Sequence, residues 1–323
     1  MDALKHNPVL VFDFGGTKLA TAVVDSLSGE IYAQVRRPTP AREGAAASLE
    51  AIYQAGREAL ANTPAPQRQV SGIGISFGGP VSRDRRKVLR SMHIAEWESY
   101  DLVAQVEASF GRPAFMDNDA NAAALGEWQF GAGQGATDLV YIQVSTGIGA
   151  GMILSSQVYR GSGLAGEFGH LTVMEDGPIC SCGNHGCVES LSSGWAIARD
   201  GRELLASGAE TLLSDMSGGK PDRLTAEMVL LACQAGDPAA CAITQRAFRY
   251  LALGMANLIT LIDPQIIVLG GGVTQSQQAM QESLAAALPE FLPPLFAGHT
   301  QVAFSRLNGL ETLLGAALLT RGY

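Results

Sequence analysis

The sequence is short of positive charge, and of charge in general. Its 323 residues include 16% charged side chains, and 22 Lys and Arg are outnumbered by 31 Asp and Glu, which gives a net charge of -9. A nucleic-acid surface needs a local excess of cations, so this balance argues against a nucleic-acid partner. One basic cluster spans 83–90, but Asp84 interrupts it, and we expect a solvated hairpin or loop there. The length predicts two domains.

Long hydrophobic runs are also missing. The first apolar run, 9–12, ends in Asp13 and two glycines, which is typical of a strand and a turn rather than of a signal-peptide core. The most apolar later stretch, 251–273, contains Asn257, Asp263 and Pro264, which would be costly in lipid. We therefore expect a helix followed by a buried strand there, no membrane partner, and a cytoplasmic location.

Cysteine is scarce and unevenly placed. There are five cysteines, an odd number, and three of them fall within eight residues, which does not resemble a disulfide framework. Cys233 and Cys241 lie in Ala-rich stretches with a helical pattern, where we expect them to be core thiols.

The clustered cysteines predict a metal site instead. Cys180, Cys182 and Cys187, together with His170, offer four zinc ligands, and the glycines between the cysteines let a loop wrap around an ion. His185 is an alternative to His170 as the fourth ligand. Four protein ligands leave no open position, so the zinc would be structural, which argues against a zinc-dependent hydrolase.

Glycine is plentiful, and it follows apolar strands. Predicted strands at 9–14 and 19–24 flank one turn, strands at 139–144 and 150–154 flank a second, and a strand at 266–269 runs into the glycines 270–272. Further strands are predicted at 70–77 and 112–116, and helices at 44–61, 119–130 and 310–319, with 196–259 mostly helical. Because the first two turns repeat after about 130 residues, we predict an α/β fold of two related halves.

The first turn has the composition of a phosphate site. The backbone N–H groups of Gly15, Gly16 and Thr17 could face a phosphate, Lys18 could add charge, and Asp13 could hold Mg²⁺ through water. A tight hairpin that needs glycine for its backbone conformation is the alternative. No helix follows the turn, so it is neither a Walker A loop nor a dinucleotide fingerprint.

A carboxylate at a predicted strand-to-helix junction is the candidate general base. Asn118 and Asp119 lie at this junction, where helix capping is the alternative explanation. We select Asp119 to take a proton from a sugar hydroxyl and Asn118 as its hydrogen-bonding neighbour. Glu167 and Glu189, beside the cysteine loop, could bind a polyol.

These motifs together resemble the ROK family of repressors, open reading frames and sugar kinases, over nearly the whole chain. The matching segments are Asp13-Phe14-Gly15-Gly16-Thr17-Lys18, Asn118-Asp119-Ala120-Asn121, Gly166-Glu167-Phe168-Gly169-His170, the cysteine run that ends at Glu189, and Asp263-Pro264 before Gly270-Gly271-Gly272. The resemblance implies a two-domain actin-like (ribonuclease-H-like) ATPase fold with a cleft between the domains. The small α/β domain would be 1–118, joined by a C-terminal helix at 308–323, and the large domain 119–307.

The resemblance also implies an ATP-dependent hexose kinase that transfers the γ-phosphate of ATP to the 6-hydroxyl of the sugar, with Mg²⁺ accompanying ATP. Asp119 would be the catalytic base, and His170 would bind zinc through one ring nitrogen and the sugar through the other. The implied sugar-binding residues are Gly79, Asn118, Asp119, Glu167, His170 and Glu189. The implied nucleotide-binding residues are Asp13, Gly15, Gly16, Thr17, Lys18, Thr146, Gly147, Gly271 and Gly272. A homodimer is expected.

The substrate and the functional class leave alternatives. Glucose leads because Glu167, His170 and Glu189 match the glucokinase-like pattern, while N-acetylmannosamine, N-acetylglucosamine, fructose and allose suit relatives with similar motifs. A sugar-responsive transcriptional regulator would carry a helix-turn-helix segment before the first glycine turn. The twelve residues that precede Asp13 are too few for one.

Overall fold

The computed structural model describes residues 6–91, 94–275 and 277–323. The chain packs as two compact units. The first comprises Met1–Leu139, Gly151–Gly166 and Ser305–Tyr323, and the second comprises Val140–Ala150 and Glu167–Phe304. The first unit therefore includes the helix that begins at Asp119 and the segment 151–166, both of which the sequence analysis assigned to the large domain.

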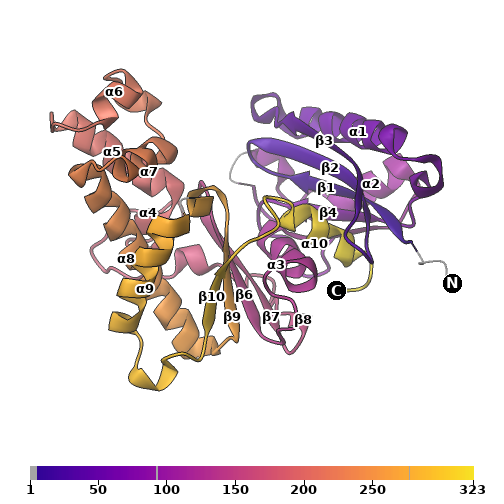
Figure 1. The fold of residues 1–323 in the computed structure, drawn as a ribbon. Helices are drawn as coiled ribbons and strands as arrows, with labels where there is room; N and C mark the ends of the chain where they lie inside the picture. Colours follow the sequence, from indigo (N-terminus) through magenta and orange to yellow (C-terminus); the bar gives the residue numbers. More distant parts are fainter. Residues whose placement is uncertain (1–5, 92–93, 276) are drawn as a thin grey trace. The chain divides into compact units, whose positions relative to one another are not determined.

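The first unit is built on a five-stranded sheet with the order β3-β2-β1-β4-β5. Its strands are β1 (Pro8–Phe14), β2 (Lys18–Asp25), β3 (Ile31–Pro38), β4 (Ile73–Phe77) and β5 (Ala114–Asn118). β1, β2 and β3 pair antiparallel, whereas β4 and β5 extend the sheet in parallel from β1. Helices α1 (Gly44–Asn62) and α2 (Leu102–Phe110) lie on one face, and α10 (Glu311–Leu319) covers the other, with α3 (Asp119–Phe130) packed against α10 (Figure 1).

Alternation along β1 divides its side chains between these two layers. Leu10, Phe12 and Phe14 belong to the core beneath α1, and Val9 and Val11 belong to the core beneath α10. Successive side chains of a strand point to opposite faces, so the apolar run 9–12 is buried on both sides of the sheet. The sheet is thus covered on both faces, and the polar residues of interest lie at the ends of its strands.

Glycines allow α3 and α10 to approach closely. A Cβ on Gly315 would lie 1.6 Å from the carbonyl oxygen of Ala122, and one on Gly126 would lie 2.1 Å from the carbonyl oxygen of Glu311. Residues 120–127 of α3 are all buried, which is typical of a helix enclosed on every side. The first turn of α3, which carries Asp119, is therefore held by tight packing.

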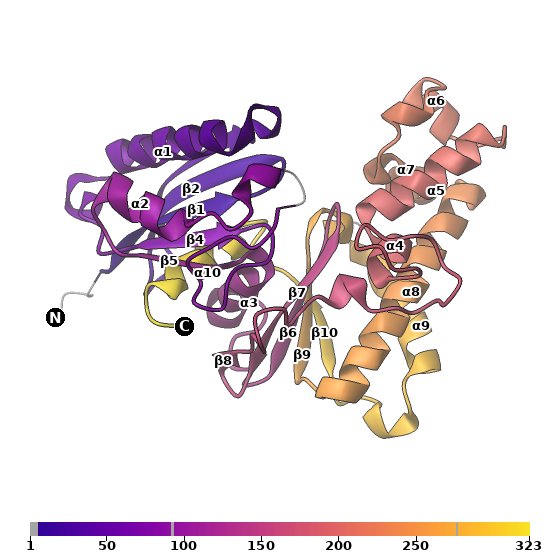
Figure 2. The same cartoon turned by 180° about the vertical axis from the view of Figure 1, so that it is seen from behind.

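The second unit contains most of a second sheet with the order β10-β9-β6-β7-β8. Its strands are β6 (Leu139–Val144), β7 (Ile148–Leu154), β8 (Gln157–Val158), β9 (Ile266–Gly270) and β10 (Gln301–Phe304). The helices are α4 (Val188–Ser192), α5 (Gly194–Ala206), α6 (Leu213–Ser217), α7 (Ala226–Gln234), α8 (Pro238–Ile262) and α9 (Gln277–Phe291). The long helix α8 packs against α4, α7 and α9, as Figure 2 shows from behind.

Short 3-10 helices connect several of these elements. They are η1 (Ala41–Glu43), η2 (Ala65–Arg68), η3 (Ala95–Trp97), η4 (Phe168–His170), η5 (Pro221–Arg223), η6 (Gly272–Gln275) and η7 (Pro294–Phe296). Within the described part of the chain, none of the helices has the length and apolarity that a membrane span requires.

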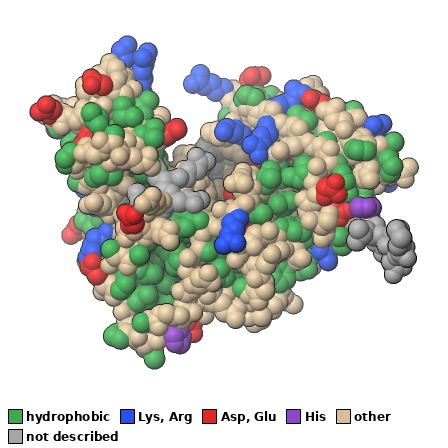
Figure 3. Space-filling model, viewed as in Figure 1, with side chains coloured by type: hydrophobic (Ala, Val, Ile, Leu, Met, Phe, Trp, Pro, Cys, Tyr) green, Lys and Arg blue, Asp and Glu red, His purple; other side chains and the backbone are tan. Residues whose placement is uncertain are grey.

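The basic cluster at 83–90 forms a loop, closed by a β-bridge between Val81 and Val88. Its cations are not all solvated, however. Arg86 forms an ion pair with Glu107 at 3.0 Å, and Arg85 lies 3.9 Å from the buried carboxylate of Asp117. Basic and acidic side chains are interspersed on the face shown in Figure 3.

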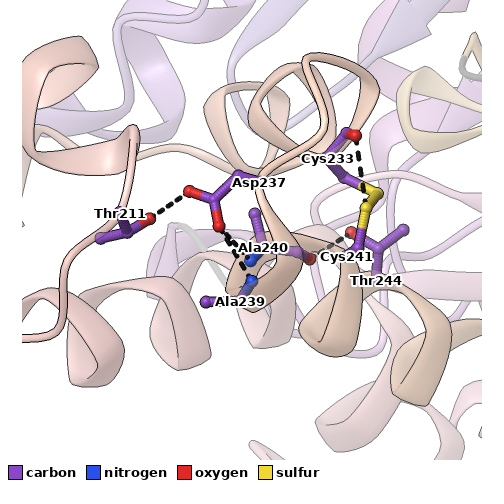
Figure 4. The surroundings of a disulfide bond; sticks show 7 residues. All are labelled: Thr211, Cys233, Asp237, Ala239, Ala240, Cys241 and Thr244. Atoms are coloured by element: carbon purple, nitrogen blue, oxygen red, sulfur yellow. Dashed lines mark hydrogen bonds between the residues drawn. A yellow bond between two sulfur atoms is a disulfide. The ribbon is translucent and has the colours of Figure 1, made fainter.

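The prediction that Cys233 and Cys241 are free core thiols is wrong. They form a disulfide that joins the end of α7 to the start of α8 (Figure 4). Asp237, in the loop that the bond closes, caps α8 by accepting from the N–H groups of Ala239 and Ala240, and also accepts from Thr211. The loop between α7 and α8 brings the two cysteines together although they are eight positions apart, and composition alone did not reveal this pairing.

Candidate functional site

Asn118 ends β5 and caps α3. Its Oδ1 accepts from the N–H groups of Ala120 at 2.9 Å and Asn121 at 3.3 Å, and its Nδ2 donates to the carbonyl oxygen of Gly79 at 3.1 Å. The capping alternative therefore applies to Asn118, whose side chain satisfies N–H groups that helix geometry leaves unpaired. It also links the start of α3 to Gly79, another predicted sugar-binding residue.

Asp119 is the first residue of α3 and faces the first glycine turn. Its Oδ1 accepts from the N–H of Ala120 at 3.0 Å. A Cβ placed on Gly78 would lie 3.7 Å from Asp119 Oδ2, 3.2 Å from the carbonyl oxygen of Phe14 and 3.9 Å from the Cα of Gly15. The carboxylate predicted as the base and the predicted phosphate turn thus meet at Gly78, where a larger residue would fill the space between them.

Asp13, at the end of β1, is a second carboxylate in this region. Ser76 on β4 donates to its Oδ1 at 2.9 Å. The pKa of Asp13 is raised to about 7, mainly by burial and also by the negative charges of Asp119 and Glu311, against the lowering effects of the Ser76 hydrogen bond and the Arg36 charge. The ionised form of Asp13 is therefore unfavourable, and a nearby cation would stabilise it.

The turn itself is a closed hairpin whose tip is exposed. The N–H of Gly15 donates to the carbonyl oxygen of Lys18 at 3.1 Å, and the Thr39 hydroxyl donates to the carbonyl oxygen of Gly15 at 2.7 Å. A Cβ on Gly15 would lie 2.6 Å from the Lys18 carbonyl oxygen, so this position requires glycine. Thr17 and Lys18 are exposed, and Gly16 is partly exposed.

Asp117 has a structural partner that sequence reasoning missed. Its Oδ1 accepts from the N–H of Asn118 at 2.8 Å and from Nδ2 of Asn121 at 2.9 Å, while Oδ2 accepts from Nε of Arg160 at 2.7 Å. Asp117 is 1% exposed, and a buried charge needs such partners to offset the loss of hydration. The two residues are 43 positions apart, and no local pattern indicates that they meet.

In the second unit, the turn between β6 and β7 is fixed by the start of α5. The carbonyl oxygen of Ser145 accepts from the N–H of Gly194 at 2.8 Å, and that of Thr146 accepts from the N–H of Trp195 at 3.1 Å. The N–H of Ser145 donates to the carbonyl oxygen of Gly147 at 2.9 Å. The turn is therefore tightly closed and cannot shift without α5.

The third glycine turn lies against the end of β6. Gly271 has φ +95°, and a Cβ there would lie 2.4 Å from the carbonyl oxygen of Val144, so both conformation and space require glycine. A Cβ on Gly272 would have no described protein atom within 4 Å. Gly271 thus brings the second and third turns together, and Gly272 faces open space.

The four predicted metal ligands converge. Their ligand atoms all lie within 4.8 Å of one another, with His170 Nδ1 3.6 Å from Cys180 Sγ and Cys182 Sγ 3.7 Å from Cys187 Sγ. Zinc–sulfur bonds of about 2.3 Å in a tetrahedron place sulfurs about 3.7 Å apart, so the spacing and the soft donor set fit zinc. His185 is outside this cluster, and its Nδ1 lies 3.1 Å from the carbonyl oxygen of Gly177.

The other ring nitrogen of His170 points toward a carboxylate. Its Nε2 lies 3.8 Å from Oε2 of Glu167, whose side chain is 47% exposed. Glu189 follows the cysteine loop, and its Oε2 accepts from the N–H of Ile148 at 2.9 Å. His170 can thus bind a metal through Nδ1 and leave Nε2 for another partner.

The structure therefore distributes the predicted site residues between the units. The first holds Asp13, Gly15, Gly16, Thr17, Lys18, Gly79, Asn118 and Asp119, and the second holds Thr146, Gly147, Glu167, His170, Cys180, Cys182, Cys187, Glu189, Gly271 and Gly272.

Comparisons with known proteins place the chain in a family. The model of the ROK family matches residues 9–322. The chain is 33% identical to the glucokinase of Streptomyces coelicolor over 317 residues, 96% of each chain, and 32% identical to the N-acetylmannosamine kinase of Escherichia coli, covering 97% of this chain and 98% of that one. It superimposes on the ROK glucokinase of Streptomyces griseus, solved with glucose and AMPPNP, with a TM-score of 0.84 and 34% identity over 98% of this chain and 100% of that one.

These similarities confirm the predicted α/β fold class, that of the two-domain actin-like ATPases. The chain belongs to the ROK family.

Proposed function

We propose that this protein is an ATP-dependent hexose kinase, with glucose as its substrate and the 6-hydroxyl as the acceptor. The observation that carries the proposal is the meeting of the Asp119 carboxylate with the first glycine turn at Gly78. A kinase needs a base for the attacking hydroxyl next to a backbone that binds phosphate. The similarity to a glucokinase solved with glucose and an ATP analogue supports both substrates.

In the proposed reaction, Asp119 accepts the proton of the 6-hydroxyl as the hydroxyl oxygen bonds to the γ-phosphorus. The bond between the γ-phosphorus and the β–γ bridging oxygen breaks, and ADP leaves. Asn118 keeps Asp119 at the start of α3 and, through its bond to Gly79, fixes the backbone beside the sugar. The N–H groups of Gly16 and Thr17 and the Lys18 ammonium bind phosphate, whereas the N–H of Gly15, contrary to the prediction, is paired with the Lys18 carbonyl oxygen. Mg²⁺ bound with ATP would supply positive charge near Asp13, whose carboxylate is costly to ionise in its absence.

Glu167, His170 and Glu189 are the proposed sugar ligands from the second unit, while Thr146, Gly147, Gly271 and Gly272 bind the nucleotide. Open space above Gly272 and the closed Ser145–Gly147 turn suit a bound nucleotide. His170 acts twice, because a metal at Nδ1 fixes the ring and leaves Nε2 to contact a sugar hydroxyl.

We propose a structural zinc ion held by His170, Cys180, Cys182 and Cys187. Burial, together with hydrogen bonds that the Cys187 thiol donates to the neighbouring thiols, raises the pKa of Cys187 to about 12. A bound cation would reverse this by favouring the thiolate. Metal analysis of the purified protein tests the proposal: we expect one zinc per chain, lost in Cys182→Ala and retained in the matched control Cys241→Ser. Equal zinc content in the two variants would contradict it.

A panel of sugars in a coupled ADP-release assay tests the substrate. Glucose should give the highest kcat/KM, and N-acetylmannosamine is the principal competitor because a kinase of that sugar is 32% identical to this chain. Faster turnover of N-acetylmannosamine would change the substrate but not the mechanism. Absence of ADP release with every hexose and amino sugar would refute the kinase function.

We also propose that the protein is cytoplasmic, since its phosphoryl donor is ATP. We propose in addition that it is a homodimer. Apolar side chains are exposed on the second unit, with Leu261 on α8 82% exposed and Ile179 in the cysteine loop 64% exposed. A shallow hollow of about 640 Å³ is lined by residues 172–175, by Asn184 and His185 of that loop, and by Leu253 and Asn257 of α8. Light scattering coupled to size exclusion should give twice the chain mass, and Leu261→Glu should give the monomer mass.

A further inference from the structure

Glu189 contacts two segments of the second unit that the sequence presented as separate motifs. It lies in the first turn of α4, directly after the cysteine loop. Its Oε2 accepts from the N–H of Ile148 at 2.9 Å, and its Oε1 accepts from the hydroxyl of Ser181, inside the cysteine loop, at 3.1 Å. One carboxylate therefore connects the cysteine loop to the turn between β6 and β7.

Glycines on both sides make this connection possible. A Cβ on Gly147 would lie 2.6 Å from Oε2 of Glu189, so any side chain there would displace the carboxylate. A Cβ on Gly169 would lie 2.2 Å from the carbonyl oxygen of Ile148, so the backbone next to His170 packs directly on the same residue. Ile148 is thus held by Glu189 at its N–H and by the 169–170 backbone at its carbonyl group.

From this arrangement we propose that Glu189 is a positioning residue for the nucleotide: it holds the 145–148 turn in the conformation that binds phosphate and ties that conformation to the order of the cysteine loop. The inference rests on the proposed function, in which Thr146 and Gly147 contact ATP. It adds a role on the nucleotide side to a residue proposed to contact the sugar. Each carboxylate oxygen has a second lone pair, so both contacts are compatible.

The two roles separate when nucleotide binding is measured without sugar. The experiment is calorimetric titration of Mg·AMPPNP into the full-length protein, with no hexose present. Glu189→Ala removes the acceptor of the Ile148 N–H and should weaken binding about tenfold or more, because a hydrogen bond to a charged group contributes roughly 1.5–3 kcal/mol. Glu189→Gln keeps an acceptor for Ile148 and should restore the affinity to within about threefold of the parent.

Glu167→Ala is the matched control. Glu167 is a neighbouring carboxylate with the same proposed contact to the sugar, and its side chain lies beside His170. Its replacement should leave the sugar-free nucleotide affinity unchanged and raise the KM for glucose. If Glu189→Ala behaves like Glu167→Ala, Glu189 serves only the sugar and the inference is overturned.

A second variant covers the case in which Glu189→Ala does not fold. Ser181 is exposed, and Ser181→Ala removes its bond to the carboxylate together with a 3.9 Å contact between its hydroxyl and Cys180 Sγ. We expect it to weaken sugar-free nucleotide binding about threefold with an unchanged melting temperature, and an unchanged affinity would again refute the inference. If the parent protein itself does not bind Mg·AMPPNP, the proposed kinase function fails. If the parent binds normally and the variants bind equally well, only the proposed role of Glu189 fails.

Discussion

Replacing Asp13 by asparagine should change how the stability of the protein depends on pH. Burial raises the pKa of Asp13 from its ordinary value of 3.8 to about 7, so the folded protein disfavours the ionised form. Below pH 3.8 the Asp13 carboxyl is protonated in both the folded and the unfolded state, so its titration does not change the free energy of unfolding. As the pH rises toward 7, the unfolded chain ionises first, and the folded state loses stability until the folded pKa is passed. The asparagine side chain does not titrate, so the variant lacks this loss.

The shift sets the size of the effect. About three pKa units at 1.36 kcal/mol each give an upper limit of about 4 kcal/mol. Part of that develops below pH 5, and the side chain keeps some exposure, which lets water stabilise the charge. We therefore expect the advantage of Asp13→Asn over the parent to grow by about 2 kcal/mol between pH 5 and pH 7.5.

Urea unfolding of the parent and of Asp13→Asn, in magnesium-free buffer across that pH range, measures the difference. Taking the difference cancels the contributions of other titrating groups, including Glu127, whose pKa is also raised by burial. A free-energy difference that does not vary with pH would show that Asp13 is already ionised at low cost. Our reason for placing a cation beside it would then be lost.

Three other substitutions test other parts of the structure. Asp119→Asn should lower kcat by at least about a hundredfold with a normal melting temperature and normal AMPPNP binding, and near-parental turnover in the ADP-release assay would mean that another group is the base. Gly315→Ala should destabilise the fold by about 3 kcal/mol in urea unfolding, because its Cβ would overlap the carbonyl oxygen of Ala122. The control Gly72→Ala should be tolerated, because the nearest neighbour of its Cβ would lie at 3.5 Å. Equal effects of the two substitutions would refute the close contact between α3 and α10. Cys241→Ser should lower the free energy of unfolding by about 2–3 kcal/mol under oxidising conditions, and a variant as stable as the oxidised parent would argue against the disulfide.

Local patterns in the sequence were sufficient for many elements. The prediction of a helix at 119–130 matches α3, and that of a strand at 139–144 matches β6, because each has a clear apolar pattern bounded by polar or glycine residues. The four residues whose ligand atoms converge, His170, Cys180, Cys182 and Cys187, could be selected from residue type and spacing. Strand β3 was missed: its sequence, Ile-Tyr-Ala-Gln-Val-Arg-Arg-Pro, mixes apolar and polar residues, and none of its residues is fully buried because it lies at the edge of the sheet.

The remaining features depend on contacts between distant residues. Arg160 pairs with Asp117, and Glu189 binds the N–H of Ile148, 41 positions away, although neither pair shares a motif. Sequence reasoning predicted Glu189 as a sugar ligand from its place beside the cysteine loop. It could not indicate the second contact, because that contact exists only once α4 and the β6–β7 turn are packed together.

The way in which α10 completes the first unit has a consequence for synthesis of the protein. Its sheet is built from residues 8–118, yet the helix that covers one face of it comes from residues 311–319, after the whole of the second unit. During translation, α10 is made last, so the apolar side chains that it covers stay exposed until then. They are Val9, Val11, Ala22 and Val24. A nascent chain of this protein should therefore recruit chaperones until its last helix emerges, and the first unit should acquire protease resistance only then.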